Sequence, residues 1–179
     1  MTTGFLALAL LAQAPAPAAS APVARPAQDT ARQARYERVL SGVSDSLDVV
    51  RGAMAAFQVD LPSASPDLVL ARASRVRNSC HGAATAAEQV STVLAGGVYI
   101  PHARVEQGKL RGGTSDLRRT LERCEREWAV LNPATRANAD SLRAWGPYRG
   151  ARLDAAIRSY VGLLRAFMKQ AALKKPAVG

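Results

Sequence analysis

Two cysteines and two histidines have the widest chemical scope in this sequence: Cys80, His81, His102 and Cys124. Zinc and di-iron sites on helices use pairs such as H-x-x-x-H or E-x-x-H, and no such pair is present. Cys80-His81 matches the end of the covalent haem motif C-x-x-C-H, but Arg77 stands where the first cysteine belongs. We therefore expect no cofactor and no metal. The alternative is a haem- or metal-binding electron-transfer protein that uses Cys80 and His81.

Basic side chains gather in the C-terminal part of the chain. The sequence carries a net charge of +10, and residues 133–179 hold nine Lys and Arg against two Asp. Arg158, Arg165 and Lys169 are spaced by seven and four residues and line one stripe of a predicted helix, and Arg152 and Lys174 belong to the same basic region. Such a surface attracts anionic lipids and polymers. We predict that these five residues contact an anionic envelope component or a protein partner; the alternative is that they only complement the helix dipole.

No motif of the sequence indicates an enzyme. The G-x-S-x-G turn that carries the serine nucleophile of α/β-hydrolases is absent. Residues 108–115 resemble a phosphate-binding loop only faintly, because the lysine precedes the glycines and no strand leads into them. We interpret these residues as a hinge followed by a helix start, which Thr114 or Ser115 caps. The expected function is therefore a non-enzymatic binding or structural module.

The first 27 residues have the composition of an export signal followed by an Ala/Pro-rich tether. Residues 4–12 are apolar or small, which matches the core of a signal peptide and is too short to span a bilayer. We expect a bacterial protein that is periplasmic or secreted, with no transmembrane span after removal of this leader. Nucleic acid is then not the expected partner. The alternative is an Ala/Pro-rich arm on a cytosolic protein.

Four segments repeat apolar residues in alternating steps of four and three, the spacing of one helix face. A strand would need a step of two. Four such faces of similar length, joined by short links, predict an all-α domain over residues 28–179 with the antiparallel up-down-up-down four-helix-bundle fold. An extended coiled-coil hairpin or an oligomer is the alternative. The predicted seams are Tyr36, Leu40, Val43, Leu47, Val50, Met54 and Phe57; Val69, Ala73, Val76, Cys80, Ala83, Ala87, Val90 and Leu94; Leu110, Thr114, Leu117, Leu121, Cys124, Trp128 and Leu131; and Leu153, Ile157, Tyr160, Leu164, Phe167 and Ala171.

Turn residues mark the ends of these segments. Ser65 and Pro66 suit the N-cap and the first position of the second helix. Glycines at 96 and 97 end that helix. Asn132-Pro133 predicts the end of the third helix and the start of a short extra helix over about 133–144, which Gly146-Pro147 separates from the last helix.

Cys80 and Cys124 fall on the seams of two consecutive predicted helices. Their midpoint in sequence is close to Pro101, so two antiparallel helices that turn there place both cysteines at the same level. In an oxidising compartment this pair is expected to form a disulfide, which in the chain-entropy model stabilises the fold by ~4 kcal/mol. Two free buried cysteines are the alternative.

Overall fold

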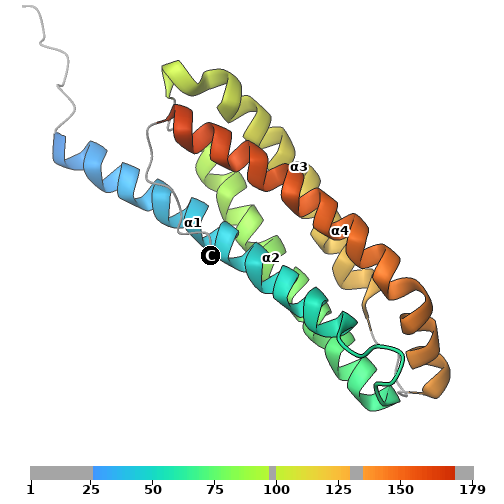
Figure 1. The fold of residues 1–179 in the computed structure, drawn as a ribbon. Helices are drawn as coiled ribbons and strands as arrows, with labels where there is room; N and C mark the ends of the chain where they lie inside the picture. Colours follow the sequence, from blue (N-terminus) through green and yellow to red (C-terminus); the bar gives the residue numbers. More distant parts are fainter. Residues whose placement is uncertain (1–25, 97–99, 130–134, 172–179) are drawn as a thin grey trace, which may run out of the picture.

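The computed structural model describes residues 26–96, 100–129 and 135–171, and this part of the chain is helical without any strand. It forms four α-helices: α1 (Pro26–Gln58), α2 (Pro66–Ala95), α3 (Arg104–Glu127) and α4 (Arg136–Gln170). A single 3-10 turn, η1 (Pro101–Ala103), leads into α3. In Figure 1 the four helices lie side by side. The predicted all-α class is confirmed, whereas the predicted leader lies outside the described residues except for its last two, which begin α1.

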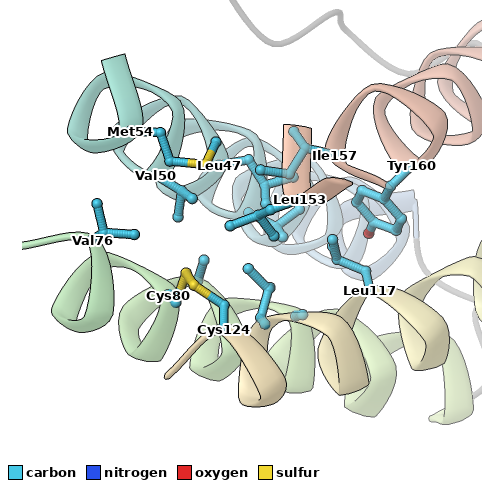
Figure 2. Close-up of a cluster of buried hydrophobic side chains, with 14 of the residues drawn as sticks. Leu47, Val50, Met54, Val76, Cys80, Leu117, Cys124, Leu153, Ile157 and Tyr160 are labelled. Atoms are coloured by element: carbon cyan, nitrogen blue, oxygen red, sulfur yellow. A yellow bond between two sulfur atoms is a disulfide. The ribbon is translucent and has the colours of Figure 1, made fainter. Parts of the chain in front are cut away.

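The four predicted seams form the core. Every seam residue from Tyr36 to Ala171 that the structure describes is buried, and only Leu131 lies outside the described residues. Figure 2 shows labelled seam side chains of all four helices pointing toward one another, with the sulfur atoms of Cys80 and Cys124 between α2 and α3. The second helix contributes three alanines to this core, at positions 73, 83 and 87.

Neighbouring helices meet in an order that reverses along the chain. Between α2 and α3, His81 contacts Glu125. Glu88 lies seven residues after His81 on α2, and it contacts Arg118, which lies seven residues before Glu125 on α3. The same reversal holds between α3 and α4 and between α1 and α4. It is seen in the pairs Thr114–Tyr160 and Trp128–Trp145, and in the pairs Tyr36–Phe167, Arg51–Asp154 and Phe57–Gly146.

The starts of α2 and α4 are set by side-chain caps. The Ser65 hydroxyl accepts a hydrogen bond from the Leu68 backbone N–H, and Pro66 takes the first helical position, as predicted. The Thr135 hydroxyl accepts from the Asn138 backbone N–H in the same way. These hydroxyls satisfy N–H groups that have no partner within the helix.

The predicted short helix over 133–144 is not a separate element. Residues 136–170 form one helix that passes through Gly146 and Pro147. The buried positions of α4 continue across this point at Leu142, Gly146, Gly150 and Leu153. The sequence prediction failed here because two of these seam positions are glycines, which interrupt the apolar pattern without interrupting the packing. Burial on both sides of Pro147 compensates for the backbone hydrogen bond that proline removes.

The predicted hinge over 108–115 is also wrong, because α3 already begins at Arg104. Gly113 serves a close contact between helices: a Cβ there would lie 2.5 Å from Cδ1 of Leu163. The Thr114 side chain is buried and its hydroxyl donates to the Leu110 carbonyl within α3, so it does not cap a helix. Thr114 is thus a core residue.

Among the described residues, no helix combines the length and apolar character needed to cross a membrane.

Candidate functional site: an arginine-lined cavity

Three arginines from two helices line a cavity of about 150 Å³ between α3 and α4. Arg123 comes from α3, and Arg149 and Arg152 come from α4. Trp128 and Leu153, both buried, contribute apolar surface to the same cavity. The cavity therefore combines an apolar base with guanidinium groups from both sides.

Aromatic contacts fix the position of Arg149. Its guanidinium carbon lies 4.1 Å from the centroid of the Trp145 ring, and its Nη1 lies 3.8 Å from Oε2 of Glu127. Trp145 packs edge-on against Trp128 with centroids 5.4 Å apart, and Trp128 packs edge-on against Phe57 at 4.8 Å. Stacking on a ring leaves the N–H edge of a guanidinium open to a ligand. The Arg149 guanidinium thus packs on an aromatic cluster that continues into the core.

Arg152 is held more loosely at the outer side of the cavity. Its guanidinium carbon lies 5.9 Å from the ring centroid of Tyr148, which is 67% exposed. Arg123 and Arg152 form no ion pair with any carboxylate in the described part of the chain at 4.0 Å or less. Two of the three guanidinium groups are therefore open to an external anion.

The charges at the cavity favour an anionic ligand. Three guanidinium groups face one carboxylate, that of Glu127. Guanidinium groups bind carboxylate and phosphate through paired N–H donors. The Thr120 hydroxyl, also at the cavity, donates to the Asp116 backbone carbonyl and is thereby engaged. The arrangement is suited to binding an anion.

A disulfide anchors the inner side of this site. The Sγ atoms of Cys80 and Cys124 are bonded at 2.09 Å, with their Cα atoms 6.1 Å apart, and the bond joins α2 to α3. Cys124 itself lines the cavity. Both cysteines are buried, and no described cysteine is free.

The structure does not bring the five predicted anion-binding residues together. Arg152 lies at the cavity. Arg158 instead donates a hydrogen bond to Asp154, whose other carboxylate oxygen forms an ion pair with Arg51 of α1. Arg165 and Lys169 are exposed and follow Arg158 along the α4 face that turns toward α1. Lys174 lies outside the described residues. The predicted set thus divides between two sides of α4.

Sequence reasoning missed Arg123, Arg149 and Glu127 as members of a site. Arg123 and Glu127 belong to a run of mixed charges on α3, a pattern that is typical of an ion-paired, solvated helix face rather than of a binding site. Each of the three residues lies beside a seam, but the sequence does not fix which residues of α3 and α4 stand at the same level. The seam positions Trp128 and Leu153 beside them were the only available signal.

The alternative haem site meets unfavourable conditions in this structure. Cys80 is bonded to Cys124 and has no free thiol for a thioether link. The His81 side chain is 68% exposed, and its Nδ1 lies 3.2 Å from Oε2 of Glu125. His102 is exposed as well, and its carbonyl accepts from Gln170. In the described segments no three His, Cys, Asp or Glu residues are placed to hold a metal ion.

No family model matches this chain, and no curated protein or solved structure shows significant similarity to it.

Proposed function

We propose that this chain is an exported, non-enzymatic helical module that binds an anionic component of the bacterial cell envelope. The site is the α3/α4 arginine cavity, the cavity lined by Arg123, Arg149 and Arg152. The observation that carries the proposal is the meeting of these three guanidinium groups, with one carboxylate opposing them. An acidic protein partner is the alternative ligand.

The fold that supports this site is proposed to be an antiparallel up-down-up-down four-helix bundle. The reversing order of contacts between α2 and α3, α3 and α4, and α1 and α4 supports that arrangement. In such a bundle α4 packs beside both α1 and α3, so its two flanks offer different surfaces. Arg152 lies on the α3 flank, and Arg158 lies on the α1 flank.

A periplasmic or secreted location is part of the same proposal. The supporting observations are the signal-like residues 4–12 and the disulfide between Cys80 and Cys124. Disulfides persist in oxidising compartments and are rare in the cytosol. Mass spectrometry of the unreduced protein from a bacterial envelope fraction tests this directly: loss of the leader with an intact disulfide is expected, and a full-length chain with free thiols would contradict export.

Calorimetric titration with tripolyphosphate tests the binding site. The double variant Arg123→Ala/Arg152→Ala removes the two unpaired guanidinium groups. Hydrogen bonds to charged groups contribute about 1.5–3 kcal/mol each, so we expect a loss of affinity on the order of tenfold or more. The affinity of the unmodified protein should fall as salt is raised.

Arg165→Ala/Lys169→Ala is the matched control, because it removes the same charge from exposed positions on the other flank of α4. This variant should keep most of the affinity. An equal loss in both variants would show that binding depends on net charge alone, and a loss confined to the control would place the site on the C-terminal stripe. Either result contradicts the proposed cavity.

A further inference from the structure

A second arginine-lined cavity lies on the opposite flank of α3. It has a volume of about 330 Å³, lies between α2 and α3, and is lined by Arg111, Arg118 and Arg119 together with Ser91 and Ser115. We call it the α2/α3 arginine cavity. The function proposed above uses only the α3/α4 arginine cavity, so this second group of guanidinium side chains has no role in it.

One row of residues on α3 connects the two cavities. Arg111, Ser115, Arg119 and Arg123 follow one another at intervals of four residues. Such a row is inclined to the helix axis and turns by about 40° at each step, because four residues exceed one turn of 3.6. Its first three members line the α2/α3 cavity and its fourth lines the α3/α4 cavity. The row therefore winds across the exposed side of α3 from one cavity to the other, over ~18 Å along the axis at 1.5 Å per residue.

The guanidinium groups along this row differ in how firmly they are paired. Arg111 and Arg123 form no ion pair with a described carboxylate at 4.0 Å or less. Arg119 pairs with Asp116 at 2.5 Å, but the two side chains are 71% and 73% exposed, so the pair contributes little and can exchange. Both ends of the row and its middle can thus turn toward an external anion.

Arg118 is held by carboxylates from two helices. It meets Glu122 on α3 at 3.2 Å and Glu88 on α2 at 4.0 Å. These carboxylates, with Asp116 and Glu127, limit the charge excess of the surface. An extended ligand therefore gains affinity from contacts with arginines that are spaced along α3, rather than from one dense positive patch.

We propose that the ligand is a linear polyanion, a flexible chain with repeated phosphate or carboxylate groups, which crosses α3 along the row from Arg111 to Arg123 and enters both cavities. This inference rests on the proposed function, because it extends the anion site at the α3/α4 cavity. A single small anion cannot reach both cavities. A planar lipid surface would contact the most exposed side of α3 but not the two cavities beside it. The placement of the arginines therefore favours a flexible linear polyanion.

The test compares tripolyphosphate with long-chain polyphosphate on the same protein. A chain that engages both cavities binds its second cavity intramolecularly, and avidity then raises affinity by on the order of a hundredfold. In Arg111→Ala/Arg119→Ala, tripolyphosphate should still bind at the α3/α4 arginine cavity. The additional affinity for the long chain should fall to the gain expected from its larger number of phosphates alone. Arg165→Ala/Lys169→Ala, which loses the same charge elsewhere, should keep the preference.

The outcomes separate this inference from the proposed function. If Arg123→Ala/Arg152→Ala weakens tripolyphosphate binding but Arg111→Ala/Arg119→Ala leaves the long-chain preference intact, the α3/α4 site stands and the polyanion path is refuted. If the tripolyphosphate affinity of Arg123→Ala/Arg152→Ala equals that of the unmodified protein, the proposed function itself is refuted. Tighter binding to phosphatidylglycerol vesicles or to duplex DNA than to long-chain polyphosphate, with the same dependence on Arg111 and Arg119, would overturn the assignment to a single flexible strand.

Discussion

Replacing Gly146 by alanine should destabilise the fold, although alanine is the better helix former. Gly146 lies inside α4 where that helix approaches two buried rings. A Cβ at this position would lie 2.7 and 2.9 Å from Cε1 and Cζ of Phe57 and 3.4 Å from Cη2 of Trp128. Both rings are about 1% exposed and pack against each other, so neither can swing into solvent. Room for the new methyl group must come from the core or from a shift of α4.

The size of the effect follows from two opposing contributions. Alanine in place of glycine stabilises a helix interior by about 1 kcal/mol. Overpacking of a filled core costs about 1–3 kcal/mol. Pro147 adds a further cost, because a Cβ on the residue before proline disfavours helical backbone angles. We therefore expect Gly146→Ala to lower the free energy of unfolding by about 1–3 kcal/mol.

Gly162→Ala is the matched control on the same helix, because a Cβ there would meet nothing within 4 Å. It should raise stability by about 1 kcal/mol. Urea unfolding of the disulfide-bonded protein, followed by circular dichroism, measures both variants. In a Phe57→Ala background the cost of Gly146→Ala should shrink, because the added methyl group then fills vacated space. A Gly146→Ala protein as stable as Gly162→Ala, or a cost independent of Phe57, would refute this reasoning.

Four further predictions concern other parts of the fold. Removing the disulfide with Cys80→Ala/Cys124→Ala should lower the free energy of unfolding by about 4 kcal/mol, the chain-entropy value for their sequence separation of 44 residues, and an unchanged urea midpoint would contradict it. Tyr36→Phe should raise stability by about 1 kcal/mol, because the buried Tyr36 hydroxyl has no hydrogen-bond partner, and a loss would show that this hydroxyl is satisfied. Burial raises the pKa of both Tyr36 and Tyr160 from 10.0 to about 12, so the neutral phenols favour the folded state. This contribution to stability should be present below pH 10 and be lost as the pH rises toward 12. A urea midpoint that stays constant over that interval would contradict this prediction. Arg143 donates hydrogen bonds to the carbonyl oxygens of Leu61 and Ala64 in the connection between α1 and α2. Arg143→Ala should therefore lower the free energy of unfolding by about 1–3 kcal/mol and speed proteolysis of that connection. An unchanged cleavage rate would contradict this role.

Much of the fold was predictable because its physical basis is local. The four-three spacing of apolar residues identified the core positions from Tyr36 to Ala171, and the cap at Ser65 marked where α2 begins. The spacing also placed Cys80 and Cys124 on facing seams. These features depend on neighbours within a helix or on the length of one connection.

Features that depend on contacts between helices were harder to predict. Gly146 and Gly113 read as breaks in the sequence, whereas in the structure each allows a close helix contact. The same limitation applies to the candidate site. Arg152 was identified from the charge of its region, but its grouping with Arg123 and Arg149 depends on the relative level of α3 and α4.

The most direct test of the proposed anion site is the tripolyphosphate affinity of Arg123→Ala/Arg152→Ala measured beside that of Arg165→Ala/Lys169→Ala. Both variants lose two positive charges, so the comparison separates the α3/α4 arginine cavity from net charge. The cavity predicts an affinity loss on the order of tenfold or more in the first variant and near-original affinity in the second. Equal affinities in the two variants would contradict the site.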